Sequence, residues 1–304
     1  MPPKVSVLMP SFNYARYLGL AIKSVLSQSY SDLEVIIVDD CSNDGSREIA
    51  EEWAHLDDRV VLVRHNVNRG LAAARNSGLG VSSGEFVALC DADDVWLPNK
   101  LSTQMRYFKR WPELGLVHSD SVIIDQDGNL TGQRFSVLMH TKRQRASGNV
   151  FGELCERNFL CVPTVTLRRE AVQYAGGFDV SLRSLEDWVC WTMVSRKYLF
   201  YYVDEALVQY RMHGASLSHD MKGMAQNRAK AIRLLLDSVS VIPRRRKAGM
   251  LYSLGISHLE TEDPRAAISA FVESIGANPV HMRSWVRLCQ AVFETATSWK
   301  SEVV

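Results

Sequence analysis

The first ninety residues alternate between short apolar runs and longer segments with helical periodicity. Four short, mostly apolar runs predict strands: Val5–Met9, Glu34–Val38, Val60–Val63 and Phe86–Cys90. They are apolar at most positions, as strands buried on both faces of a parallel sheet are. Between them apolar residues recur every third or fourth position, which predicts helices that follow Tyr17, lead up to Trp53 and span Leu71–Val81. This alternating order predicts an α/β fold with a mostly parallel sheet and right-handed crossovers.

The middle of the chain is less regular. Its pattern predicts a helix over Pro98–Trp111 and another after Glu186. Short apolar runs predict strands near Leu116–His118, Val162–Leu167, Leu199–Val203 and Leu207–Tyr210. The polar and basic stretch from Asp125 to Asn149 is typical of a long surface loop, which could act as a lid.

From Met221 onward only helical periodicity is present. Residues there follow the spacing of a tetratricopeptide repeat, at Leu251, Leu254, Gly255, His258, Ala267, Phe271 and Pro279. The fit is close, except that His258 and Ser274 stand where Tyr and Ala are usual. Trp285 follows Leu251 by 34 residues, where a second repeat would place its aromatic residue. An ordinary helical hairpin is the alternative interpretation. We therefore expect an α/β domain over residues 1–220 and a small helical region, possessing a tetratricopeptide-like pattern, over 221–304.

Composition excludes several classes of protein. The chain has 304 residues, with 35 Lys and Arg against 34 Asp and Glu, so its formal net charge is +1. This balance argues against a nucleic-acid partner bound by bulk charge. The six cysteines form no C-x-x-C motif, which favours reduced thiols. No secretory signal is recognised and no run of about 18 apolar residues occurs, so we expect a cytoplasmic protein without a spanning helix.

Two nucleotide-binding motifs are absent. The segment after the first predicted strand reads Pro-Ser-Phe-Asn-Tyr-Ala, where a dinucleotide-binding enzyme would have G-x-G-x-x-G. The P-loop G-x-x-x-x-G-K-[ST] does not occur either. These absences argue against NAD, FAD, ATPase and GTPase chemistry. A nucleotide held by carboxylates and a metal ion remains compatible with the sequence.

Acidic residues follow the fourth predicted strand as Asp91-Ala92-Asp93-Asp94. Ligands of parallel sheets bind beyond the carboxyl ends of the strands, so this segment would lie at the site. Carboxylates two positions apart on extended backbone point the same way and could share one ligand. Oxygen ligands suit a hard divalent cation, Mg²⁺ or Mn²⁺, which keeps positions open for diphosphate oxygens. The alternative is a solvated acidic turn.

Two further loops at this edge contain candidate ligands for a nucleotide. Asp39 and Asp40 follow the second strand, where a carboxylate commonly accepts hydrogen bonds from a base or ribose. Helix capping by Ser42 or Asp44 is an alternative role for that loop. Phe12, after the first strand, could stack on a base or could simply cover the edge of the core.

These motifs together resemble family 2 glycosyltransferases. The resemblance covers roughly residues 4 to 219 and rests on motifs in the expected order: Val5–Asn13, Ser27–Tyr30, Val35–Gly45, Asn68–Asn76, Gly84–Phe86, Asp91–Asp94, Gly176–Asp179, Glu186–Trp188 and Tyr210–His213. Each motif is short, but the ordered set is specific. It implies a GT-A fold and metal-dependent transfer from a nucleoside-diphosphate sugar, with a UDP-sugar favoured.

The resemblance also implies roles for individual residues of the donor site. Asp40 would bind the base, Phe12 would stack near it, and Pro10 and Ser11 would line the pocket. Asp91 would meet the ribose or sugar. Most relatives have Tyr where this chain has Phe12, so a hydroxyl contact would be missing.

The remaining roles concern the metal and the reaction. Asp93 would ligate the metal directly, with His213 as a second metal-site residue. Arg75 would add positive charge near the donor diphosphate. Asp187 would act as the catalytic base, although acids are also favoured in the first turn of any helix.

One base is enough for direct displacement, which inverts the anomeric centre. Because Q-x-x-R-W and membrane helices are absent, we expect a single addition rather than processive synthesis. The expected acceptor is a glycan or lipid-linked glycan of cell-surface polysaccharide synthesis. The alternative is a catalytically weak relative that binds a nucleotide-sugar and acts as a scaffold through its helical tail.

Basic residues raise the question of membrane contact. Arg244–Lys247, together with Lys142, Arg143 and Arg145, could hold the protein weakly at an anionic surface. The alternative is a solvated linker between two helices, which Pro243 favours because it marks a turn.

Overall fold

The computed structural model describes residues 4–138, 146–214 and 220–302. The chain forms two compact units, 1–150 with 159–216 and 151–158 with 217–304. Residues 151–158, which the sequence-based division at residue 220 left in the first domain, group with the C-terminal helices.

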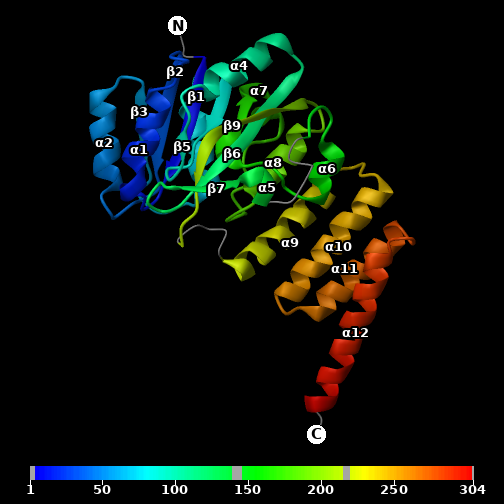
Figure 1. Ribbon diagram of the computed structural model, residues 1–304. Coiled ribbons are helices and arrows are strands. Elements are labelled where there is room, and N and C mark those ends of the chain that lie inside the picture. Colours follow the sequence, from blue (N-terminus) through cyan, green and yellow to red (C-terminus); the bar gives the residue numbers. More distant parts are fainter. Residues whose placement is uncertain (1–3, 139–145, 215–219, 303–304) are drawn as a thin grey trace. The chain divides into compact units, whose positions relative to one another are not determined.

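The first unit is built on one nine-stranded sheet in the order β3-β2-β1-β4-β8-β6-β9-β5, with β7 paired to β6 (Figure 1). The strands are β1 Val5–Ser11, β2 Leu33–Asp39, β3 Val60–Arg64, β4 Phe86–Leu89, β5 Val95–Trp96, β6 Leu114–Ile124, β7 Leu130–Arg134, β8 Thr166–Arg168 and β9 Leu199–Arg211. β1 pairs in parallel with both β2 and β4, and β2 pairs in parallel with β3. This confirms the predicted α/β fold with a mostly parallel sheet flanked by helices.

Helices connect these strands. Those of the first unit are α1 Ala15–Leu26, α2 Ser46–Leu56, α3 Leu71–Val81, α4 Lys100–Arg110, α5 Phe135–Leu138, α7 Arg169–Tyr174 and α8 Glu186–Val194. The apolar side of α1, from Leu18 to Val25, packs with β1 and β2 in the main core. Burial of this apolar face explains why the helical periodicity was readable in the sequence.

Three predictions for the middle of the chain are corrected. The two short strands expected from Leu199 onward are one continuous strand, β9. Val162–Thr164 forms a 3-10 helix, and the neighbouring strand β8 is confined to Thr166–Arg168. The expected surface loop from Asp125 to Asn149 contains β7 and α5, while Lys142, Arg143 and Arg145 lie outside the described residues.

The fourth correction concerns β6, which extends well beyond Leu116–His118. It pairs with β7 and β8 along one edge and with β9 along the other, so its polar residues lie inside the sheet. Asp120 illustrates the reason, because its buried carboxylate accepts hydrogen bonds from the backbone and hydroxyl of Ser136 at 3.1 and 2.6 Å. Buried polar groups in a strand can be hydrogen-bonded by residues far away in the sequence. Such a strand lacks the continuous apolar run by which a buried strand is recognised.

The second unit is entirely helical in its described part. Its helices are α6 Phe151–Glu156, α9 Met221–Ser238, α10 Arg244–Glu260, α11 Pro264–Ala277 and α12 Met282–Glu302. Gly255 of α10 lies against the ring of Phe271 in α11, where a Cβ atom would come within 2.4 Å of that ring. Arg244–Lys247 is the first turn of α10 rather than a linker, and Pro243 is its N-cap residue. None of the described helices has both the length and the apolar character needed to cross a membrane.

Candidate functional site

The loops after β1 and β2 are joined to each other at the carboxyl edge of the sheet. The backbone N–H of Asn13 donates to Ser42 Oγ at 3.0 Å, and the N–H of Asn43 donates to Asn13 Oδ1 at 2.9 Å. Asp44 Oδ2 accepts from the N–H of Ala15 at 3.0 Å, at the beginning of α1. The N-cap position of α2 is Gly45, and Asp44 Oδ1 accepts from the N–H of Ser46, the first residue of that helix, at 3.0 Å. Asp44 therefore contributes to the cap of α2, whereas Ser42 accepts from Asn13.

Pro10, Ser11 and Phe12 are located on this edge. Pro10 and Ser11 are the last two residues of β1, paired with Val38 and Asp39 of β2. The hydroxyl of Ser11 is buried and has no hydrogen-bond partner among the described residues. The side chain of Phe12 is 43% exposed just beyond the strand. An exposed ring beside an unsatisfied buried hydroxyl suits a ligand that offers a flat face and a polar edge.

The acidic residues after β4 form a turn rather than the extended segment assumed from the sequence. The N–H of Asp94 donates to the backbone carbonyl of Asp91 at 3.2 Å, which closes the turn. The carboxylates of Asp91 and Asp93 consequently meet different partners. Asp91 Oδ1 accepts from Arg75 at 2.9 Å, and Asp93 Oδ2 lies 2.9 Å from Nε2 of His213.

Burial and crowding alter the acidity of this turn. Burial, and then the neighbouring Asp91, raise the pKa of Asp93, while the hydrogen bond from His213 opposes that rise. The pKa of Asp94 lies well above its ordinary value because it is fully buried beside the same acids. Oδ2 of Asp94 has no partner among the described residues. A turn of this kind favours an added positive charge.

Arg211, at the end of β9, fastens the acidic turn to the sheet. Its backbone N–H donates to Asp94 Oδ1 at 2.8 Å, and its Nε donates to the backbone carbonyl of Asp93 at 2.7 Å. Two residues further on, His213 reaches Asp93 and lies against the ring of Tyr17, with 5.3 Å between the ring centroids. The Tyr210–His213 motif therefore has a structural part, Arg211, and a part that faces the carboxylates, His213.

Arg75 is completely buried and bridges two elements. Its guanidinium pairs with Asp91 at 2.9 Å and also with Glu186, and it lies 5.7 Å from the ring centroid of Phe178. The sequence placed Arg75 near a diphosphate. In the structure its charge is already matched by two carboxylates, so its direct contacts are with the protein.

The first turn of α8 presents the Glu-Asp pair. The helix is preceded by Leu185, whose positive φ of 67° turns the chain sharply into the helix. Both Glu186 and Asp187 are buried, and burial raises the pKa of Glu186 to about 7 although Arg75 lowers it. Oε2 of Glu186 has no partner among the described residues. Because Arg75 holds both Asp91 and Glu186, the first turn of α8 lies beside the acidic turn.

Asp40 is directed into the protein. Its Oδ1 lies 2.6 Å from Nδ1 of His65 and accepts from the N–H of Arg69 at 2.8 Å, while Oδ2 accepts from the N–H of Gly70 at 2.8 Å. Gly70 has a φ of 84° and is the N-cap residue of α3, a conformation that favours glycine. In this structure Asp40 therefore orders the loop before α3, and its contact with a base stays a prediction.

The residues present suit a divalent cation chemically, but they do not form a complete cage. Among the described residues, no group of three or more His, Cys, Asp or Glu is arranged to hold a metal ion. A small hard cation is commonly bound by one or two carboxylates together with phosphate oxygens of the substrate. Asp93, the unpartnered Oδ2 of Asp94 and the nearby imidazole of His213 fit such a partial site.

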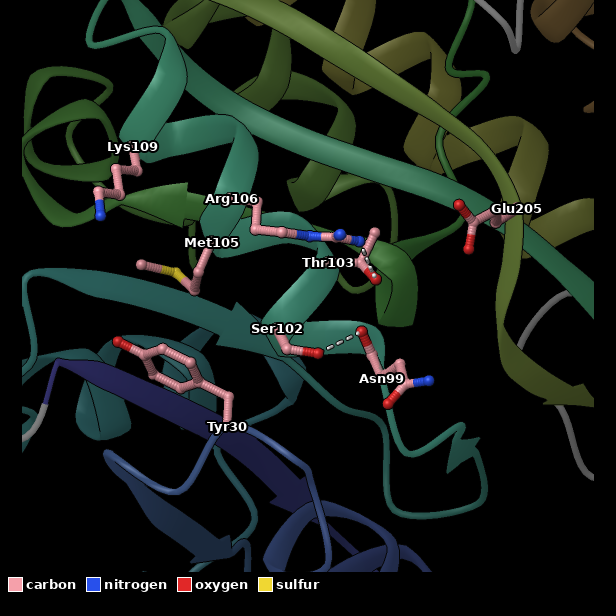
Figure 2. A pocket seen from close by; sticks show the side chains of 8 residues that line it. All are labelled: Tyr30, Asn99, Ser102, Thr103, Met105, Arg106, Lys109 and Glu205. Carbon is pink, nitrogen blue, oxygen red and sulfur yellow. Dashed lines mark hydrogen bonds between the residues drawn. The ribbon is translucent and has the colours of Figure 1, made fainter.

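A separate cavity of about 560 Å³ lies along α4, shown in Figure 2. It is lined by Tyr30, Asn99, Ser102, Thr103, Met105, Arg106, Lys109 and Glu205. None of these residues belongs to the acidic turn or to α8, and Tyr30 precedes β2 rather than following it. This cavity is therefore distinct from the cluster at the carboxyl edge.

Sequence comparison decides the family. Residues 6–173 match the model of the family described as "Glycosyl transferase family 2". The chain belongs to this family. The matched range contains β1–β4, the acidic turn and Arg75, whereas Asp187 and His213 lie beyond it.

Two curated relatives illustrate the extent of the similarity. Over 218 residues the chain is 30% identical to the "Putative teichuronic acid biosynthesis glycosyltransferase TuaG" of Bacillus subtilis, which covers 71% of this chain and 82% of TuaG. It is 40% identical over 126 residues to an uncharacterized glycosyltransferase of Nostoc sp., covering 41% of our chain and 38% of that protein.

Solved structures show the same fold. The mannosyltransferase PcManGT from Pyrobaculum calidifontis, in complex with GDP-Man and Mn²⁺, superposes with a TM-score of 0.64 at 19% identity, covering 99% of our chain and 84% of that chain. S. aureus TarS 1–349 in complex with UDP-GlcNAc superposes with a TM-score of 0.64 at 17% identity, covering 90% of our chain and 81% of that chain. These likenesses establish the GT-A fold of the first unit.

Sequence reasoning missed three residues that the structure brings into the site. Asp94 was grouped with the acidic run without a role, Arg211 was only part of a motif, and Glu186 was only the neighbour of the expected base. All three are buried, and each has an ionic or hydrogen-bond partner more than a hundred residues away in the sequence. The acidic pair Glu186-Asp187 directly before the apolar run Trp188–Trp191 is the sequence signal that could have identified one of them.

Proposed function

We propose that this enzyme transfers a sugar from a nucleoside-diphosphate sugar to a hydroxyl group of an acceptor, by a single displacement with inversion. The observation that carries the proposal is the bridge made by Arg75, which pairs with Asp91 and Glu186. The bridge sets Asp187 beside the acidic turn at the end of β4. Direct displacement requires a base near the donor sugar, within hydrogen-bond reach of the acceptor hydroxyl and on the side opposite the leaving diphosphate.

Asp93 is the proposed metal ligand, with His213 beside it and Asp91 toward the ribose or sugar. A bound Mg²⁺ or Mn²⁺ would supply positive charge that offsets the diphosphate leaving group. The GT-A neighbour in complex with GDP-Man and Mn²⁺ supports a divalent cation for this fold. Burial and then the neighbouring Asp91 raise the pKa of Asp93, and a cation bound beside this carboxylate would offset both effects, which supports the same role.

Asp187 is the proposed catalytic base, since an acceptor hydroxyl is a poor nucleophile until its proton is removed. Its place in the first turn of α8 supports this role, because Arg75 already engages the adjacent Glu186 and leaves that residue to position the turn. Glu186 is therefore a proposed positioning residue rather than a base.

The donor proposed is a UDP-sugar, with Phe12 stacking on the base and Pro10, Ser11 and Asp40 forming the base pocket. The UDP-GlcNAc complex of TarS supports a uridine nucleotide, and the GDP-Man complex of PcManGT shows that the fold also accepts guanosine. The unsatisfied hydroxyl of Ser11 supports a polar contact in the pocket.

The proposed acceptor is a glycan or lipid-linked glycan of a cell-surface polysaccharide, as the name of TuaG suggests for that relative. We further propose a cytoplasmic enzyme that makes weak peripheral contact with a membrane, and a tetratricopeptide-like arrangement of α10, α11 and α12. The close packing of Gly255 on Phe271 supports that arrangement.

The proposal is tested by incubating the purified full chain with UDP-, GDP- and dTDP-sugars, with and without Mn²⁺. We expect release of UDP from one UDP-sugar that requires Mn²⁺ and falls strongly in Asp187→Asn. Proton NMR of a sugar transferred to an added acceptor reports inversion. Metal-dependent nucleotide binding without turnover of any donor would instead indicate a nucleotide-sugar-binding scaffold.

A further inference from the structure

The turn before α10 and the turn between α11 and α12 lie at the same end of the helical unit. The hydroxyl of Ser274, near the end of α11, donates to the backbone carbonyl of Ala248 in α10 at 2.7 Å and lies 2.7 Å from the hydroxyl of Ser284 in α12. His281 also contacts the ring of Tyr252 in α10, with 5.5 Å between the ring centroids. The beginnings of α10 and α12 are therefore neighbours (Figure 1). We call residues 239–247 and 278–287 together the basic end.

The charges of the basic end have one sign. Its charged residues are Arg244, Arg245, Arg246, Lys247, Arg283 and Arg287, and neither segment contains Asp or Glu. Arg246 is engaged within the unit, because it pairs with Glu153 and Glu156 of α6. The side chains of the other five are exposed.

Carboxylates gather at the opposite end of α10 and α11. Glu260, Glu262 and Asp263 lie at the turn between these two helices, where Asp263 caps α11 through the N–H of Ala266 at 3.0 Å. The acids near the basic end are Asp237, in the last turn of α9, and Glu153 and Glu156 of α6, which pair with Arg246 and leave the other five cations unmatched by them. The unit therefore has a polarity that would orient it toward a negatively charged surface.

Large apolar side chains are exposed among these cations. Val241 is 78% exposed, Val280 79%, Met282 68% and Trp285 44%. The indole N–H of Trp285 donates to the backbone carbonyl of Pro279 at 2.9 Å, so its polar atom already has a partner. Cations beside exposed apolar residues and a tryptophan are typical of surfaces that lie in the interface of a lipid bilayer.

We propose that the basic end docks the protein peripherally on an anionic lipid surface, with Val241, Val280 and Trp285 entering the headgroup region. A second copy of the chain is the competing occupant, but pairing two basic ends would bring like charges together. This inference deepens the membrane part of the proposed function and locates the contact outside the catalytic unit. Vesicle binding measured without donor or metal separates its failure from a failure of the transfer chemistry.

The experiment is co-sedimentation of the full chain with phosphatidylcholine vesicles, with and without phosphatidylglycerol, at low and high salt. We expect binding only to the anionic vesicles, and its loss at high salt. The variant Arg244→Ser/Arg245→Ser/Lys247→Ser should bind on the order of 100-fold more weakly, because each cation near an anionic surface contributes about a fivefold factor. The matched control Lys23→Ser/Lys109→Ser/Arg196→Ser removes the same charge from exposed positions of the other unit and should bind nearly as the parent does.

A second variant tests the apolar contribution. Val241→Glu/Val280→Glu changes two highly exposed side chains, so the helical unit should fold normally, as circular dichroism would verify. We expect this variant to lose vesicle binding as well. Equal binding to neutral vesicles, or equal losses in the triple variant and its control, would overturn the proposal. Self-association in sedimentation velocity that Val241→Glu/Val280→Glu abolishes, without vesicle binding by the parent, would assign the surface to a second copy.

Discussion

The guanidinium of Arg75 lies 2.9 Å from the carboxylate of Asp91, with the arginine side chain fully buried and the aspartate partly exposed. On its other side Arg75 holds Glu186, so one cation from α3 joins the end of β4 to the beginning of α8. The position of Asp187, the proposed base, therefore depends on Arg75, which the family resemblance had placed near the donor diphosphate.

We expect Arg75→Met to destabilise the fold by about 3–5 kcal/mol, because it leaves the buried carboxylate of Glu186 without its counter-ion. Urea unfolding followed by circular dichroism measures this loss. Adding Glu186→Gln should recover a large part of it, since the uncompensated charge is then removed. Equal instability of the single and double variants would show that packing against Phe178, rather than charge, accounts for the loss.

Asp93→Ala should weaken binding of UDP in the presence of Mn²⁺ by at least about 10–100-fold, a loss typical even of residues that only support a metal ligand. Binding of UDP without metal should change little. Isothermal titration calorimetry measures both, with Asp58→Ala as an exposed acidic control. Unchanged affinity in the presence of Mn²⁺ would remove Asp93 from the metal site.

Asp187→Asn should leave donor binding largely intact and lower turnover by about 10²–10⁴, the usual contribution of a general base. Glu170→Gln is the matched control, because Glu170 is an exposed acid in the first turn of α7. It should retain full turnover. A parallel loss of donor binding and turnover in Asp187→Asn would give Asp187 a structural role.

Lys100 predicts a specific dependence of stability on pH. Its ammonium is buried 3.8 Å from the ring centroid of Trp96 and 2.9 Å from Gln104 Oε1, and burial lowers its pKa from 10.5 to about 7. Between these values the unfolded chain holds a proton that the folded chain has released, so this residue makes stability rise with pH from about 7 to 10.

Lys100→Met should therefore remove that rise while leaving the remaining pH dependence in place. Urea unfolding of both proteins between pH 7 and 10 measures the difference in their slopes. The hydrogen bonds lost to Gln104 and Thr166 add an offset that varies little with pH. Parallel stability profiles for the two proteins would show that Lys100 keeps its ordinary pKa.

The sequence predicted the strands whose buried side chains are apolar. It missed most of the strand whose buried side chains are polar. β1, β2 and β4 were visible because almost every residue in them is hydrophobic and buried. β6 was predicted only near Leu116–His118, because the polar residues from His118 to Ser121 interrupt its apolar pattern and their partners are not visible in the sequence. Their hydrogen bonds reach residues such as Ala146 and Ser136, which no local pattern connects to a strand.

The same limit applies to the site. The family resemblance identified Asp93 and His213, and the structure brings them within 2.9 Å across 120 positions of sequence. It could not reveal that Asp91 and Asp93 diverge, because that depends on a turn rather than on extended backbone. Nor could it reveal that His65, Arg69 and Gly70 already engage Asp40, since those contacts arise only when the loop before α3 folds against β2.

The short helix α6 belongs to the helical unit although the segments before and after it belong to the first unit. The chain leaves the first unit at residue 150, returns at 159 and leaves again at 216. Leu154 and Cys155 of α6 are fully buried, and α6 packs on α10. A protein cut at residue 220 would keep α6 and lose the helices that cover it, so it would expose apolar surface in the middle of its catalytic half. The helical tail is therefore not a detachable module, and exchanging it between relatives would require transplanting residues 151–158 along with it.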